Sequence, residues 1–406
     1  MRKIRGLIAA ALFALVSHAA AAEPVKLTWY MWSSSEAEVT AWKHIAGLVT
    51  EKYPDISVEF QTTAFLDYWT KLPALAASNR MPDIVSLQSL RFPGFAGLME
   101  PLEGRMTADK FDTAAFAPSI MSSFMRDGHQ LAIPYDFGPL LLYYNHDMFT
   151  KAGVALPKPG WTAADYNAAA KALTKDGNFG AVVSTPDAFM AFATSEGASY
   201  LDASGKLDLS NAGIKKAFRD YVALVATDKV APLFPASGTL SSTVANGRFT
   251  SGGAAMYVDG PWQVINIKKK AAFTVGLAPL PARDAGSVSI SAGSGFGIAA
   301  SGKHKEEAWK AIQVMTSPDA ERYLAENGRA FAARSDAQKY WFDTAATGVV
   351  GAADAINTSL KTAKPYVTTP NWAMIATLFE QYAPLAFGGS ESPDKVLETI
   401  QQLAAQ

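Results

Sequence analysis

The sequence predicts an α/β protein with mostly parallel sheets that helices cover on both faces. The chain has 406 residues, of which 49% are hydrophobic and 18% charged, so it is long enough for two or three globular domains. Segments with the alternation of strands and segments with the periodicity of helices follow one another along it. An aromatic content of 11% and a net charge of −1 exclude a disordered chain.

Residues 1–22 have the pattern of a secretory signal peptide. A basic start is followed by an apolar run over 8–16 and by three alanines at 20–22, which form a small-residue cleavage site. The apolar run is well short of the roughly 20 residues that a membrane span needs. No cysteine follows the cleavage point, so we expect an exported, periplasmic protein without a lipid anchor.

The first part of the mature chain contains a β-α-β-α-β series. Strand patterns occupy residues 25–31, 56–60 and 83–87, and helix patterns occupy 37–53 and 69–77 between them. This order favours a mostly parallel sheet, because a helix between two strands carries the chain back to the same end of the sheet.

The alternation continues to the end of the chain. Further strand patterns lie at 138–144, 254–258 and 273–280, and further helix patterns at 162–173, 305–315, 317–328 and from 392 onward. Thr162 and Asp165 form a capping box, and serine-proline pairs open the last two helices. No linker rich in proline, glycine and serine divides the chain. Two lobes that the chain crosses between more than once therefore fit better than two consecutive domains.

Composition and motifs argue against nucleic-acid binding, metal binding and most enzymes. A net charge of −1 gives no strongly basic surface, and the absence of cysteine excludes thiolate sites. The four histidines after residue 22 form no i,i+4 pair, and no nucleophile elbow, phosphate-binding loop or calcium loop is present. We expect a protein that is not an enzyme and has no cofactor. An exported glycosidase stays open as an alternative, although no spacing singles out a carboxylate pair.

Several of the nine tryptophans stand beside polar or turn residues instead of inside apolar runs. Trp32 directly follows the first strand and precedes three serines and Glu36. Ligands of open α/β sheets lie at the carboxyl ends of strands, and an aromatic face flanked by hydroxyls and a carboxylate suits a sugar. Trp29, Trp42 and Trp309 lie in periodic segments and are expected in the core.

An ordered set of motifs resembles that of the family 1 extracellular solute-binding proteins of carbohydrate ABC importers, the maltose-binding-protein-like group. The set includes P-D-I-V in 81–85, L-Y-Y-N-H-D-M-F at 142–149, G-A-A-M to G-P-W at 253–262, and G-I-A with K-E-E-A-W in 297–309. At 159–162 the chain has P-G-W-T, a small departure from the family's P-x-T-W. Each motif is weak alone, but the order and spacing hold over most of the chain.

The resemblance implies the two-lobed periplasmic-binding-protein fold, with a ligand cleft at the hinge. The first lobe would take 23–135 and 280–327, the second 137–277 and 330–406, with crossings near 134–137, 276–279 and 327–331.

The resemblance also implies a function. The protein would capture a mono- or oligosaccharide by hinge closure and deliver it, as a monomer, to the membrane subunits of an ABC permease. Two other ligands stay open for the same fold: a phosphorylated polyol, or a quaternary amine held by aromatic and acidic groups.

The family pattern places candidate ligand-binding residues at strand ends and crossings. They are Trp32, Ser34, Ser35, Glu36, Trp69, Gln88, Arg91, Asp136, Trp262, Gly295, Phe296 and Trp372. Trp262 matches the family's stacking tryptophan, and Trp372 resembles a late stacking aromatic. Asp136, at the first crossing, would accept hydrogen bonds from sugar hydroxyls. Relatives often have an aspartate near Gln88, so the neutral side chain here leaves the ligand's orientation open.

Overall fold

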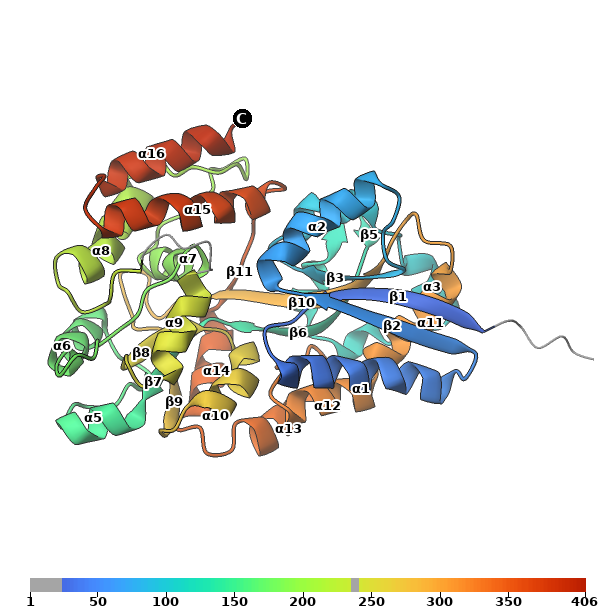
Figure 1. The fold of residues 1–406 in the computed structure, drawn as a ribbon, viewed down its shortest axis with the longest axis horizontal. Coiled ribbons are helices and arrows are strands. Elements are labelled where there is room, and N and C mark those ends of the chain that lie inside the picture. Colours follow the sequence, from blue (N-terminus) through green and yellow to red (C-terminus); the bar gives the residue numbers. More distant parts are fainter. Residues whose placement is uncertain (1–23, 235–240) are drawn as a thin grey trace, which may run out of the picture.

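The computed structural model describes residues 24–234 and 241–406, and the predicted signal peptide lies outside these ranges. Figure 1 shows two bodies side by side, joined by long central strands. We call the part built on strands β1, β2 and β3 the first lobe, and the part built on β7, β8 and β9 the second lobe. Within the described ranges, no helix is long and apolar enough to cross a membrane.

The first lobe is built on a parallel sheet with one long antiparallel neighbour. β1 (Val25–Trp32) pairs in parallel with β2 (Ile56–Thr63) and β3 (Ile84–Gln88), which confirms the predicted series. β10 (Ile290–Ile298) runs antiparallel to β3 on one side and to β6 (Ile133–Pro139) on the other.

Seven helices and a small hairpin belong to or adjoin the first lobe in the described chain. They are α1 (Glu36–Lys52), α2 (Phe65–Ala77), α3 (Glu103–Ala108), α4 (Pro118–Ser122), the hairpin β4 (Met125–Arg126) and β5 (His129–Gln130), α11 (Lys305–Met315), α12 (Pro318–Glu326) and α13 (Gln338–Tyr340). The α1 helix begins at the Ser35 cap and buries Trp42, Ile45 and Val49, as its apolar spacing predicts.

The second lobe has a three-stranded sheet in the order β8-β7-β9. β7 (Leu141–Asn145) pairs antiparallel with both β8 (Met256–Asp259) and β9 (Val275–Ala278). The expectation of a mostly parallel sheet therefore holds for the first lobe and is wrong for this one. Strand direction was not determined by the alternation of segments, since long connections with several helices can return to either end of a sheet.

Helices surround this second sheet. They are α5 (His146–Ala152), α6 (Ala163–Leu173), α7 (Asp187–Ser195), α8 (Ala212–Ala226), α9 (Ser241–Thr250), α10 (Val264–Lys270), α14 (Ala352–Thr362), α15 (Trp372–Phe387) and α16 (Pro393–Ala404). The predicted capping box at Thr162 and the Ser392-Pro393 start of the last helix are both present. Helices α8, α15 and α16 pack against one another (Figure 1).

β6 and β10 connect the two lobes. Gly293 of β10 faces β6 so closely that a Cβ atom there would lie 2.2 Å from the carbonyl oxygen of Asp136. The glycine-rich segment around it thus serves close strand packing. The short strand β11 (Lys364–Pro365) joins β10 at its start.

The domain boundaries remain a proposal, and one crossing needs revision. Residues 276–279 overlap β9, inside the second sheet, so we propose β10 as the second crossing. Gly276 is required for another reason, because a Cβ atom there would lie 2.0 Å from the ring of Tyr144. The first and third crossings stay at 134–137 and 327–331, where Phe137 donates to the carbonyl of Phe331.

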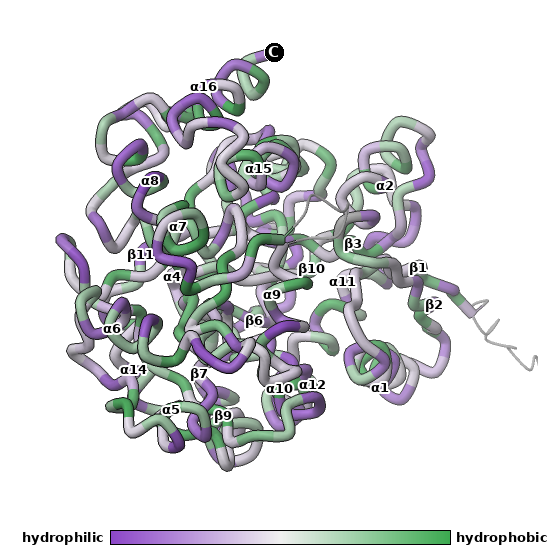
Figure 2. Tube along the Cα trace, turned by 60° about the vertical axis from the view of Figure 1, so that its left-hand side comes forward, coloured by the Kyte–Doolittle hydropathy of each residue, from purple (hydrophilic) through white to green (hydrophobic). Residues whose placement is uncertain are grey.

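Large apolar side chains fill both lobes. Trp29, Trp42 and Trp309 are buried in the first lobe, as predicted, and Phe189, Phe218 and Phe379 form part of the second core. Figure 2 shows hydrophobic residues along β3 and β10 and hydrophilic residues on the outer turns of α8 and α16. The strand ends between the lobes are the exception, since polar side chains gather there.

Candidate functional site

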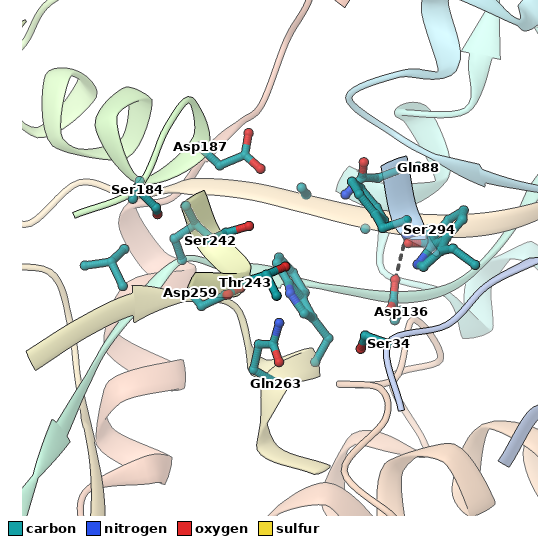
Figure 3. Close-up of a pocket in the computed structure, with 18 of the residues that line it drawn as sticks. Ser34, Gln88, Asp136, Ser184, Asp187, Ser242, Thr243, Asp259, Gln263 and Ser294 are labelled. Atoms are coloured by element: carbon teal, nitrogen blue, oxygen red, sulfur yellow. Dashed lines mark hydrogen bonds between the residues drawn. The ribbon is translucent and has the colours of Figure 1, made fainter. Parts of the chain in front are cut away.

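A cavity of about 160 Å³ lies between the two lobes, at the carboxyl ends of β1, β3 and β8. We call it the central cavity. Figure 3 shows its polar side chains in two groups that face one another. Ser34, Gln88, Asp136 and Ser294 stand on one side, and Ser184, Asp187, Ser242, Thr243, Asp259 and Gln263 on the other.

The first lobe supplies an aromatic wall and a carboxylate. Trp32, the last residue of β1, is packed by Phe65 and Trp69, with ring centres 5.8 and 5.3 Å away. Glu38 accepts hydrogen bonds from Ser34 Oγ at 2.8 Å and from Asn266 Nδ2 of α10 at 2.9 Å. Glu38 therefore joins the two lobes at the edge of the cavity.

A buried ion pair forms the floor between the lobes. Arg329 Nη1 lies 3.1 Å from Asp136 Oδ2, and both side chains are at most 4% exposed. The backbone N–H of Ser294 donates to Asp136 Oδ1 at 2.6 Å. Burial raises the pKa of Asp136 to about 6, although the positive charge of Arg329 acts in the opposite direction. Asp136 and Arg329 both line the central cavity.

The second lobe supplies another carboxylate and a partly exposed tryptophan. Asp259 ends β8 and accepts hydrogen bonds from Tyr257 Oη and from the Gly260 N–H. Burial raises the pKa of Asp259 to about 6, and the hydrogen bonds from Tyr257 and from the Gly260 N–H partly offset this rise. The Trp262 ring lies over Gly260, where a Cβ atom would be 2.2 Å from the ring. Glycine at this position thus leaves room for the ring beside the cavity.

The donor and acceptor set of the central cavity suits a polyhydroxylated ligand. Carboxylates and amides accept and donate to hydroxyls, while the Trp262 and Trp32 rings can lie against C–H faces. Among residues 24–234 and 241–406, no three histidine, aspartate or glutamate side chains gather closely enough to hold a metal ion.

A family model described as "Bacterial extracellular solute-binding protein" matches residues 49–355, well over half of the chain. The protein belongs to this family. The predicted resemblance and the two-lobed α/β fold are thereby confirmed.

Relatives and solved structures agree with this assignment. A binding protein of Brucella abortus is 25% identical over 97% of this chain and 95% of its own length. The arabinooligosaccharide-binding protein of Bacillus subtilis is 26% identical over 61% of each chain. The ABC substrate-binding protein of Listeria monocytogenes in complex with cycloalternan superposes with a TM-score of 0.83 at 25% identity, covering 93% of this chain and 97% of that one.

This solute-binding protein brings five of the predicted residues together in the central cavity. They are Trp32, Ser34, Gln88, Asp136 and Trp262. Trp69 and Arg91 line a second cavity beside it.

The other five predicted residues lie elsewhere. Ser35 caps α1 by accepting from the Glu38 N–H at 3.2 Å, and Glu36 is exposed in the first turn. Gly295 and Phe296 lie inside the first lobe, because β10 enters its core after Ser294, and the Phe296 ring packs against Trp29 and Tyr135. Trp372 is fully buried against Tyr200 and Tyr366 in the second lobe.

Sequence reasoning missed most of the polar lining of the central cavity. Asp259 and Gln263 flank the Gly260-Pro261-Trp262 motif, and Arg329 lies within a predicted crossing, so a closer inspection of those segments could have found them. Glu38, Ser184, Asp187, Ser242 and Thr243 carry no comparable signal, because they reach the cavity only through the packing of α1, α7 and α9.

Proposed function

We propose that this solute-binding protein captures a saccharide between its two lobes and releases it, unchanged, to the membrane subunits of an ABC permease. The observation that carries this proposal is the central cavity, in which the partly exposed Trp262 stands among carboxylate, amide and hydroxyl side chains from both lobes. Each sugar hydroxyl needs such partners, and the apolar face of the ring needs an aromatic surface. The sugars named for the Listeria and Bacillus proteins support the same ligand class.

Hinge closure is the proposed mechanism. The lining comes from both lobes, so a ligand that bridges them would bind the closed form more tightly than the open form. The contact between Glu38 and Asn266 joins α1 to α10 and would form only when the lobes approach. We propose that the closed monomer is the form that the permease recognises, and that export to the periplasm depends on residues 1–22.

A cationic ligand is the second candidate. Glu38, Asp136, Asp187 and Asp259 line the central cavity. Among the described lining residues Arg329 is the only basic one, and it is already paired with Asp136. Acidic and aromatic groups together can hold a quaternary amine. The same charge balance disfavours a phosphorylated polyol.

A thermal-shift screen separates these ligands. The purified mature protein would be heated with glucose, mannose and arabinose, their di- and trisaccharides, choline and glycerol 3-phosphate. A ligand at 100 times its Kd stabilises the native state by about 2.7 kcal/mol. A rise with saccharides supports the proposal, a rise with choline alone supports the cationic alternative, and loss of a saccharide over time would indicate an enzyme.

Truncation of Trp262 to alanine should weaken sugar binding without unfolding the protein. The ring is partly exposed and lies over Gly260, so its removal leaves no closed cavity in the core. We expect a loss of roughly 1.5 kcal/mol or more, from the lost stacking and burial. Calorimetric titration measures it. Trp262→Phe, which keeps an aromatic face, should retain most of the affinity, and an unchanged Kd in Trp262→Ala would remove this ring from the site.

A further inference from the structure

Three carboxyl groups of the second lobe lie at the surface that the first lobe covers. Asp259, at the end of β8, lines the central cavity, and Glu380 of α15 lines the second cavity, of about 230 Å³. Asp187, at the start of α7, lines both. Figure 3 shows Asp187 and Asp259 on the same side of the central cavity. The state of these carboxyl groups therefore depends on whether the two lobes are together or apart.

The first lobe covers these carboxyl groups mainly with aromatic rings. Trp32 lines the central cavity, Trp69 the second cavity, and Phe65 both. Arg91 brings a positive charge to the second cavity, but it donates to Gln88 Oε1, and in the described part of the chain no carboxylate lies within 4.0 Å of it. Closure of the lobes thus takes water away from the three carboxyl groups without giving them an ion pair.

The hydrogen-bond partners of the three carboxyl groups are neutral and belong to their own lobe. They are Tyr257 and the Gly260 N–H for Asp259, Tyr366 for Asp187, and the N–H and the hydroxyl of Ser241 for Glu380. These contacts lie within one lobe, so they can persist when the lobes separate. What closure changes is the access of water.

No nearby group supplies a compensating charge among the described residues. The central cavity is also lined by the carboxylate of Glu38 and by Arg329, whose charge is held by Asp136 at 3.1 Å. The other titratable groups that interact with the three carboxyl groups are tyrosines, and burial raises the pKa of each above its ordinary value near 10, so they stay neutral between pH 5 and pH 8. They are Tyr143, Tyr200, Tyr257 and Tyr366.

Burial therefore favours the protonated form of all three groups. It raises the pKa of Asp259 to about 6 and that of Glu380 to about 7, and the negative charge of Asp187 adds to both rises. The pKa of Asp187 is also raised by burial, although the positive charge of Arg91 acts in the opposite direction. When the lobes separate and water reaches these groups, their pKa values should return toward the ordinary values of about 4.

We propose that closure of the two lobes takes up protons on Asp187, Asp259 and Glu380, so that the protein captures its solute more tightly at pH 5 than at pH 8. The inference rests on the proposed function, because it requires capture by hinge closure. A group whose pKa is higher in the closed form than in the open form favours closure below its open-form pKa. This advantage is lost as the pH rises through the closed-form value, here between about 6 and 7.

Calorimetric titration at pH 6, in buffers of different ionisation enthalpy, measures the protons taken up on binding. The probes are glucose, mannose and arabinose with their di- and trisaccharides. We expect an uptake of about one proton for each sugar bound, and a Kd at least tenfold lower at pH 5 than at pH 8. One carboxyl group whose pKa moves from about 4 to about 6 changes the closing equilibrium about tenfold over this range.

Variants locate the protons. Glu380→Gln and Asp259→Asn should each take up fewer protons than the wild type at pH 6. Glu398 is an exposed carboxylate of α16 that lines neither cavity, so Glu398→Gln is the matched control and should keep the full uptake. Sugar binding without proton uptake, with the same Kd at pH 5 and pH 8, would overturn the inference and leave the proposed function intact. Full uptake in both cavity variants would overturn it as well.

A second measurement needs no ligand. The sequence contains no cysteine, so Ala74→Cys on α2 and Gln381→Cys on α15 provide two exposed positions for a pair of dyes. Both helices line the second cavity, so energy transfer between the dyes reports how close the lobes are. A larger closed fraction at pH 5 than at pH 8 supports the inference, and an unchanged distance contradicts it. If no sugar binds at any pH, the proposed function is rejected, and this measurement alone decides whether closure takes up protons.

Discussion

Replacing Arg329 with glutamine is expected to lower the free energy of unfolding by about 3–5 kcal/mol at pH 8, because it leaves the buried carboxylate of Asp136 without its cation. The loss should be much smaller at pH 5. The pKa of Asp136 is already raised to about 6 in the native protein and should rise further without Arg329. A carboxylate whose native pKa lies above its unfolded pKa is stabilising below the unfolded value, and this contribution is lost as the pH rises through the native value.

Urea denaturation at pH 5 and pH 8 measures the effect. Arg322→Gln is the control, because Arg322 on α12 forms an exposed ion pair with Glu326 and its loss should change little at either pH. An equal loss at both values of pH in Arg329→Gln would show that Arg329 acts through packing on Trp42, whose ring centre is 4.6 Å away, and not through charge.

Trp372→Ala is expected to destabilise the protein by about 3–5 kcal/mol while leaving the sugar affinity of the folded fraction unchanged. The ring is fully buried, with the rings of Tyr200 and Tyr366 centred 5.7 and 5.6 Å away. Its indole nitrogen has no hydrogen-bond partner in the described residues, so the cost comes from lost packing and from the void left behind.

Thermal unfolding and calorimetric titration of Trp372→Ala and Trp262→Ala together make a reciprocal comparison. The Trp372 variant should lose stability and keep its Kd, and the Trp262 variant should do the opposite. A weakened Kd with normal stability in Trp372→Ala would return this residue to the ligand site, where the sequence pattern had placed it.

Local patterns were sufficient for the series of strands and helices that opens the first lobe. The β1-α1-β2-α2-β3 series follows from the spacing of apolar residues, and the Ser35 cap sets the start of α1. Motifs at strand ends were sufficient for part of the site. Trp32 and Gln88 are the last residues of β1 and β3, Trp262 lies in the turn after β8, and all three line the central cavity. Those signals are local, because the residues that produce them are close in the chain.

The sequence by itself determined the α/β class and the family, and five of its twelve candidate site residues meet in the central cavity. Only the tertiary structure decided that β7, β8 and β9 are antiparallel, that Trp372 and Phe296 are core residues, and that Arg91 and Asp187 face a second cavity. Burial and charge pairing depend on contacts between distant segments: Asp136 and Arg329 are 193 residues apart. Neither periodicity nor a short motif predicts such a contact, because two segments that are distant in the sequence meet only in the folded chain.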